Sequence, residues 1–134
     1  MKKDLSTVTT LGIGGVCQEF HQLDNEPELI SLVKQLDESG QKIAVIGDGS
    51  NIYFSDSGFD GHVIQVCTKG NSYEFDACSG GMLTVSAGEN WDELVQFTLS
   101  KGLANLESLS GIPGTVGAAP IQNIGAYGHE VSEV

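Results

Sequence analysis

The turn Gly47-Asp48-Gly49-Ser50-Asn51 is the first stretch whose residue types suit binding chemistry, and it follows an apolar run that ends at Ile46. Glycines let the backbone adopt left-handed conformations and approach a ligand closely, and successive N–H groups in such a turn form a concave nest for an anion. The Ser50 and Asn51 side chains add donors. Taken alone, the pattern favours an ordinary strand-to-strand turn, which uses the same residue types, and a phosphate-binding loop is the alternative. It is not a Rossmann fingerprint, because Ile52 stands where that fingerprint needs glycine.

A second candidate is the run from Gly111 to Gly128, which is dense in glycine and alanine and so clears space for a flat or extended ligand beside the backbone. A helix beginning near Thr115 would point its free N–H groups and its positive dipole end at a phosphate. Gln122 and Asn123 carry amide groups that can read the edge of a heterocycle. The alternative is a close helix-to-sheet contact, which also requires small residues.

Other polar and aromatic residues have structural interpretations. Glu89 comes just before a predicted helix, where a carboxylate is favoured by the helix dipole, so capping is the preferred interpretation. Trp91 is predicted to lie in a core. The segment Thr9 to Gly15 is interpreted as a flexible leader into a first strand at Val16 to Phe20.

Cysteine and histidine spacing predicts neither a disulfide framework nor a metal site. The cysteines form an odd set without a CxxC pair, and the histidines are far apart and lack the spacing of metal ligands. A metal site would therefore require that some of these residues lie close together in the folded chain. The cysteines are Cys17, Cys67 and Cys78, and the histidines are His21, His62 and His129.

The charge composition disfavours some classes of binding partner. The formal net charge is -12, all six basic residues are lysines, and arginine is absent. Nucleic acid and anionic membrane surfaces are poor partners, because both require a positive patch. An anionic ligand would have to be held by backbone N–H groups. With no long apolar run and no leader pattern, we expect a cytoplasmic protein.

The elements that must position the first turn form an α+β unit. Asn25 is a predicted N-cap with Glu28 in the capping-box position, apolar residues recur at helical spacing from 29 to 36, and Gly40 marks the helix end. Strands are predicted at 42–46, 52–54 and 62–66. With the first strand, the order is β-α-β-β-β over residues 1–67.

A second unit is predicted over residues 68–134. Strands are expected at 73–75 and 83–87 around the turn Ser79-Gly80-Gly81, followed by a helix that Asn90 caps and that ends before Gly102. The spacing of leucines from 103 to 109 predicts a further short helix.

Four blocks of sequence, taken in order, resemble the UDP-N-acetylenolpyruvoylglucosamine reductase family. They are residues 10–15, 46–51, 86–91 and 112–117 with 120–128, and the resemblance spans nearly the whole chain. It implies a FAD-binding fold of the vanillyl-alcohol-oxidase (PCMH) type, with the first subdomain complete, the second truncated after Val134, and the substrate-binding domain absent. It also implies a place in peptidoglycan synthesis.

The resemblance also implies which residues hold FAD. The pyrophosphate would be held by Gly47, Gly49, Ser50 and Asn51 of the turn. The dinucleotide would be lined by Pro113, Gly114, Thr115, Gly117 and Ala118, at the start of the run from Gly111 to Gly128. The flavin would be lined by Ile121, Gln122, Asn123, Gly125, Ala126 and Tyr127, at the end of that run.

In the family, NADPH reduces the flavin and the flavin passes hydride to the enolpyruvyl group of a UDP-sugar. The family's catalytic arginine, serine and glutamate lie beyond the segment matching Val134, so no catalytic residue is assigned and the chain alone is expected to be inactive. An unpaired strand edge in the second unit predicts self-association. Three alternatives stay open: a non-catalytic flavin- or nucleotide-binding module, a chain that binds nothing stably, and an oxidase with covalent FAD. The last needs a histidine or cysteine at the cofactor loops, which residues 47–51 lack.

Overall fold

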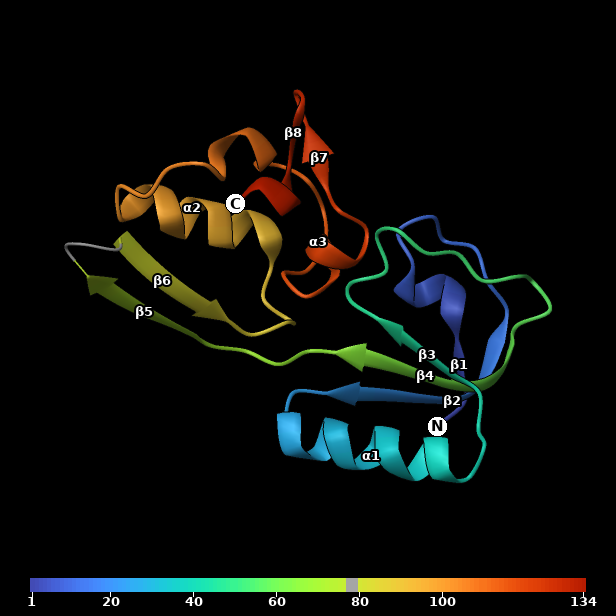
Figure 1. Ribbon diagram of the computed structural model, residues 1–134. Helices are drawn as coiled ribbons and strands as arrows, with labels where there is room; N and C mark the ends of the chain where they lie inside the picture. Colours follow the sequence, from blue (N-terminus) through green and yellow to red (C-terminus); the bar gives the residue numbers. More distant parts are fainter. Residues whose placement is uncertain (77–79) are drawn as a thin grey trace. The chain divides into compact units, whose positions relative to one another are not determined.

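A computed structural model describes residues 1–76 and 80–134, and the chain divides into two compact units. Unit 1 is Met1–Thr68 and unit 2 is Lys69–Val134. Both are mixtures of helix and strand (Figure 1). Cys78 and Ser79 lie outside the described residues, so the predictions for them have no structural counterpart. No helix in the described part of the chain is both long enough and apolar enough to span a membrane.

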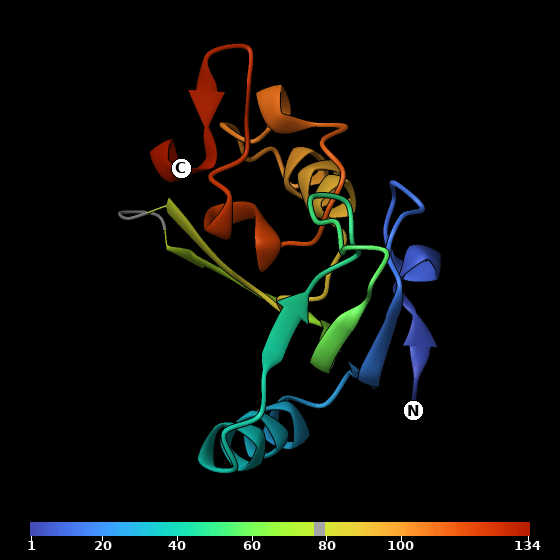
Figure 2. The same cartoon turned by 90° about the vertical axis from the view of Figure 1, so that its right-hand side faces the viewer.

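Unit 1 is built on a four-stranded sheet in the order β1-β2-β4-β3 (Figure 2). β2 and β3 each pair with β4 in parallel, and β1 adds to β2 in the antiparallel direction. The strands are β1 (Lys3–Asp4), β2 (Val16–Leu23), β3 (Ile43–Ile46) and β4 (Phe59–Val66).

Apolar side chains from the unit 1 sheet form two clusters. Successive residues of a strand point to opposite faces, and Val63 and Ile64 of β4, both fully buried, belong to different clusters. The Ile64 cluster includes leucines of helix α1 (Glu26–Glu38), which covers that face (Figure 1). The Val63 cluster includes Leu5 of the 3-10 helix η1 (Leu5–Val8).

The local signals at α1 predicted its ends correctly. The Asn25 side chain accepts a hydrogen bond from the Glu28 N–H at 3.0 Å, which satisfies one of the free donors of the first turn. Gly40 follows the helix with a φ of 66°, a conformation that glycine adopts without a Cβ penalty.

Two predictions for unit 1 are wrong. Residues 52–54 form no strand; Phe54 is buried in the Val63 cluster with Ile52 packed against it, so this apolar run serves packing. The segment Thr9 to Gly15, predicted to be a flexible leader, is also held by hydrogen bonds to the rest of unit 1. Its Thr10 N–H donates to the Gly49 carbonyl at 3.0 Å and its Gly15 N–H donates to the Ser55 carbonyl at 2.9 Å. The chain therefore enters the fold at β1 and η1, before Val16.

Unit 2 combines a strand pair, a helix and a compact C-terminal segment. Its buried cluster gathers around Trp91, whose indole N–H donates to the Leu109 carbonyl at 2.9 Å, so the prediction that Trp91 lies in a core is confirmed. The elements are β5 (Asn71–Asp76), β6 (Gly80–Val85), α2 (Trp91–Ser100), η2 (Glu107–Leu109), α3 (Ala118–Ile121), β7 (Gly125–Ala126), β8 (His129–Glu130) and η3 (Val131–Glu133).

The predictions for unit 2 were better for the helix α2 than for the turns. Asn90 caps it by accepting the Glu93 N–H at 3.0 Å, and Gly102 follows its end with a φ of 71°. The helix predicted from the leucines reduces to η2. Gly80 and Gly81, predicted to lie in a turn, pair with β5 as the first residues of β6.

Candidate functional site

The glycine turn of unit 1 lies directly after β3 and is fixed by hydrogen bonds within the unit. The Gly49 carbonyl accepts the Thr10 N–H at 3.0 Å, and the Gly47 carbonyl accepts the Gln65 side-chain amide at 3.1 Å. The Ser50 N–H donates to the Asp48 carboxylate at 3.1 Å. One donor of the predicted nest is therefore satisfied inside the turn, and the turn itself is held against the segment that follows η1.

Glycine is required at position 49 for a reason that the sequence did not show. Gly49 has a φ of 80°, which is left-handed. A Cβ built there would overlap the Val8 carbonyl oxygen and come within 3.0 Å of Thr9 Cα. The close backbone approach predicted for this position is thus made by the protein's own chain, at the end of η1.

The start of the second run packs against the strand-to-helix connection that precedes α2. The Val116 N–H donates to the Glu89 carbonyl at 2.9 Å and the Gly117 N–H donates to the Ala87 carbonyl at 2.8 Å. α3 begins at Ala118 and has four residues. The prediction of a helix from Thr115 with free N–H groups is therefore wrong, because backbone carbonyls already take the N–H groups of the two residues before α3.

Gly117 needs to be small because of packing. Its φ of -69° is ordinary, yet a Cβ there would come within 2.5 Å of the Ala87 Cβ. This contact supports the alternative interpretation of a small-residue packing contact at this position. Gly114 differs, since its φ of 133° is a conformation that side chains rarely adopt.

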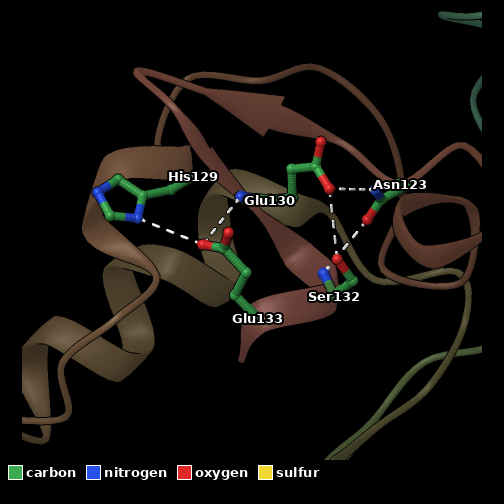
Figure 3. Close-up of polar contacts among 5 residues, drawn as sticks. All are labelled: Asn123, His129, Glu130, Ser132 and Glu133. Atoms are coloured by element: carbon green, nitrogen blue, oxygen red, sulfur yellow. Dashed lines mark hydrogen bonds and ion pairs between the residues drawn. The ribbon is translucent and has the colours of Figure 1, made fainter.

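Asn123 orders the C-terminal segment through both ends of its side-chain amide (Figure 3). Its Nδ2 donates to the Glu130 carboxylate at 2.7 Å, and its Oδ1 accepts the Ser132 N–H at 3.3 Å. Asn123 has a φ of 47°, which asparagine tolerates better than most residues. The amide predicted to read a heterocycle is thus already engaged in tying residues 123–132 together.

Tyr127 combines exposure with an unusual backbone. It joins β7 to β8 together with Gly128, and positive φ values of 54° and 81° at the two residues are those of a type I′ hairpin turn. Asparagine or glycine normally occupies the first position, whereas a bulky residue with positive φ is uncommon. The Tyr127 side chain is 90% exposed and that of Ile121 is 87% exposed. Both therefore present apolar surface suited to a flat ring.

Glu89 does not cap α2, contrary to the preferred interpretation. Its carboxylate accepts the Gly70 N–H at 2.7 Å and lies 3.2 Å from the Lys69 ammonium, while Asn90 makes the cap. The hydrogen bond from Gly70, followed by the contacts with Lys69, lowers the pKa of Glu89 below its ordinary value. This carboxylate therefore ties the residues that enter β5 to the start of α2.

We expect Glu89→Gln to lower the free energy of unfolding of unit 2 by about 1 kcal/mol at pH 7, because a charge-assisted hydrogen bond becomes a neutral one. Since folding lowers the pKa, this contribution is full above the ordinary value of 4.5 and is lost as the pH falls below it. The difference between the two proteins should therefore shrink at pH 3 in denaturant titrations read by amide exchange in α2. Glu93→Gln, at an exposed glutamate in the first turn of α2, is the control. An equal loss of unfolding free energy in the control would contradict the role assigned to the Glu89 carboxylate.

Parallel pairing of β2 and β4 brings together three potential metal ligands that their sequence spacing did not predict. Glu19, His21 and His62 each offer a ligand atom, and these atoms lie within 4.8 Å of one another. His21 and His62 are 41 residues apart, so only the pairing register could have revealed their proximity.

Comparison with known proteins identifies the class to which this fold belongs. The FAD-binding domain family model matches residues 18–134. UDP-N-acetylenolpyruvoylglucosamine reductase of Saccharopolyspora erythraea is 46% identical over 132 residues, covering 97% of this chain and 36% of the relative. The enzyme of the same name from Cutibacterium acnes is 43% identical over 129 residues, covering 96% and 34%. The chain therefore spans about a third of the length of these relatives.

A solved structure agrees with this result. The crystal structure of UDP-N-acetylenolpyruvylglucosamine reductase from Thermus caldophilus superposes with a TM-score of 0.69 at 28% identity, over 97% of this chain and 44% of that one. The predicted α+β FAD-binding fold of the vanillyl-alcohol-oxidase type is confirmed. Because the family match covers most of its length, this chain belongs to the FAD-binding domain family.

Proposed function

We propose that this chain is the FAD-binding portion of a flavin-dependent reductase that uses NADPH to convert UDP-N-acetylenolpyruvoylglucosamine into UDP-N-acetylmuramate. The match to the FAD-binding domain family over residues 18–134 carries this proposal. The names of the relatives give the substrate and the reduction, and the resemblance to their family implies NADPH and the product. The product belongs to peptidoglycan synthesis, so the protein would serve cell-wall formation, cell shape and division from the cytoplasm.

In unit 1 the proposed FAD-binding residues are Gly47, Gly49, Ser50 and Asn51. Backbone N–H groups are the donors suited to the pyrophosphate here, because the chain has no arginine. The hydrogen bonds to Thr10 and Gln65 hold the turn in a fixed shape, which lowers the entropy lost on binding. These hydrogen bonds support the proposal that the turn acts as a rigid backbone cradle for the pyrophosphate.

In unit 2 the proposed residues fall into a backbone-lined part and an exposed apolar part. Ile121 and Tyr127 carry the exposed surface that suits the flavin side. When bound, FAD supplies the hydride-transfer chemistry, and the protein holds and orients it. The remaining residues are Pro113, Gly114, Thr115, Gly117, Ala118, Gln122, Asn123, Gly125 and Ala126.

Titration of the chain with FAD, followed by the flavin fluorescence, tests the proposal. We expect saturable binding of one FAD per chain, with weaker binding of FMN because it lacks the pyrophosphate-linked adenosine. No residue is proposed as catalytic, so NADPH oxidation that depends on the UDP-sugar is expected to be absent. Equal affinity for ADP and FAD would favour a nucleotide-binding module, and absence of binding would contradict the proposal.

Tyr127→Asn separates the structural role of this position from a role in binding. Asparagine suits the left-handed position of a type I′ turn, so we expect the variant to stabilise the β7–β8 hairpin by about 0.5–1 kcal/mol. If Tyr127 lies along the flavin, FAD affinity falls at the same time by about tenfold, as expected for a lost aromatic contact. Thermal unfolding and FAD titration measure the two effects. Unchanged affinity in the stabilised variant would remove Tyr127 from the site.

For partners, we propose that the chain binds neither nucleic acid nor membranes, in keeping with its net charge of -12.

We also propose self-association through the β5–β6 pair. Within the described residues no further strand joins this sheet, and Phe75 and Met82 are 70% and 68% exposed. Light scattering should show a concentration-dependent increase in mass that the Phe75→Ser/Met82→Ser double variant abolishes. A monodisperse monomer at all concentrations would contradict this.

A further inference from the structure

Unit 1 carries a cluster of three potential metal ligands on the same face of the sheet as α1. Residues two apart on a strand share a face, so Glu19 and His21 of β2 point to the side of the neighbouring Leu23, whose cluster includes α1. His62 of β4 pairs in register with Glu19. His21 Nε2 lies 3.0 Å from His62 Nδ1, and the Glu19 carboxylate lies 3.8 Å from the same nitrogen.

We propose that Glu19, His21 and His62 bind a divalent transition-metal ion of the zinc type, which clips β2 to β4. Two imidazoles and one carboxylate form a donor set that zinc and its neighbours accept, leaving a position open for water. Tetrahedral bonds of about 2.1 Å place two ligand nitrogens about 3.4 Å apart, so a small rotation of the rings, which are now 3.0 Å apart at these nitrogens, would accommodate the ion. The half-exposed Glu19 side chain has the freedom to close the longer separation.

The two histidines are already ordered for this role. Their rings stack with a centroid distance of 5.3 Å and an interplanar angle of 11°, and the His62 side chain is only 12% exposed. Both come from adjacent strands of one sheet, so little side-chain entropy remains to be lost on binding. In the metal-free state one imidazole donates its N–H to the other. For both nitrogens to bind an ion, that proton moves to the other nitrogen of its own ring and each imidazole stays neutral.

The charges around the cluster act in opposite directions. The chain carries a net charge of -12, which favours a cation. The N-terminal ammonium of Met1 contacts Glu19 Oε1 at 3.0 Å and opposes it. The other oxygen, Oε2, is the one that faces His62, so the carboxylate can bind the ammonium and the ion at once. In the described part of the chain, no other group of three histidine, cysteine or acidic side chains lies close enough to share an ion.

An ion at this position would stabilise the sheet that carries the glycine turn. His62 also pairs in register with Ile43 at the start of β3, and β3 leads into residues 47–51. A ligand that binds only the folded state raises the melting temperature in proportion to the logarithm of its concentration. We therefore expect Zn²⁺ to raise the melting temperature of unit 1.

Calorimetric titration of the full, tag-free chain with Zn²⁺ tests the site. We expect one ion per chain, at least tenfold weaker binding by His21→Gln and His62→Gln, and unchanged binding by His129→Gln. His129 is the third histidine of the chain, belongs to unit 2 and is exposed, and its ring lies 3.4 Å from the Glu133 carboxylate, so it is the control. Mg²⁺, which prefers oxygen ligands, should not compete. Equal competition by Mg²⁺ would reduce the effect to nonspecific binding by the acidic surface and overturn the proposal.

A second measurement on the unmodified chain protects the test against variants that fail to fold. Nitrogen-15 NMR of the histidine rings should show the signals of His21 and His62 shifting on Zn²⁺ addition while His129 stays in place. Co²⁺ should give visible bands of a nitrogen and oxygen site, without the thiolate charge-transfer band that binding by Cys17 or Cys67 would produce. Unmoved ring signals, or a thiolate band, would overturn the proposal.

Discussion

Gly49→Val is expected to abolish FAD binding and to destabilise unit 1 by about 2–5 kcal/mol. Two physical effects add. Valine at a φ of 80° carries backbone strain of roughly 1–2 kcal/mol. Its Cβ must also displace the Val8 carbonyl at the end of η1, and overpacking of this kind costs about 1–3 kcal/mol. The turn then loses the shape that we propose for the pyrophosphate, so FAD titration and amide exchange in β4 should both change.

The control for this prediction is Gly40→Val. Gly40 has a similar φ of 66° but no atom within 4 Å of an added Cβ, so this variant carries the backbone strain without the collision. It should lose only about 1–2 kcal/mol and keep its affinity for FAD. Equal effects of the two variants would mean that contact with η1 is irrelevant. A stable Gly49→Val chain that binds FAD normally would remove the turn from the site.

Gly117→Ala is expected to destabilise unit 2 by about 1–3 kcal/mol through overpacking alone. The new methyl group would come within 2.5 Å of the Ala87 Cβ and would push the Gly117 N–H away from the Ala87 carbonyl, which it now contacts at 2.8 Å. The backbone conformation itself suits alanine, because φ is -69°. Denaturant unfolding with amide exchange in α2 measures the loss.

The double variant Ala87→Gly/Gly117→Ala tests the contact itself. It moves one methyl group from one side of the contact to the other and leaves the new Cβ 3.0 Å from residue 87 Cα, so it should recover at least half of the loss. Additive losses would contradict the packing explanation. If the double variant regains stability but not FAD affinity, Gly117 acts in binding as well as in packing.

Helices with local signals were predictable from the sequence. The residues that begin and end α1 and α2 lie within a few positions of each helix terminus. The side chains of Asn25 and Asn90 cap the N-termini by accepting the backbone N–H of the residue three positions later. Gly40 and Gly102 follow the C-termini with positive φ. Capping and glycine preferences are local, so a single sequence carries them. The family resemblance, based on four ordered blocks, was likewise sufficient to predict the FAD-binding fold.

Long-range contacts could not be predicted in the same way. Residues 52–54 have the composition of a strand, but Phe54 is used in the core instead of in a sheet. The role of Gly49 depends on Val8, about 40 residues earlier in the chain, and that of Gly117 depends on Ala87, about 30 residues earlier. The pairing of His21 with His62 depends on the parallel register of β2 with β4, and neither strand encodes its partner. Such features require the folded structure, because tertiary packing decides them.

The central claim is that this chain binds FAD through the turn at residues 47–51 and the segment at residues 113–127. The most direct measurement is a nitrogen-15 NMR titration of the labelled chain with FAD, with FMN as the comparison ligand. The account predicts saturable shifts of the amides in both segments, with the turn responding to FAD far more than to FMN. Shifts absent from both segments at saturating FAD, or no shifts at all, would contradict it.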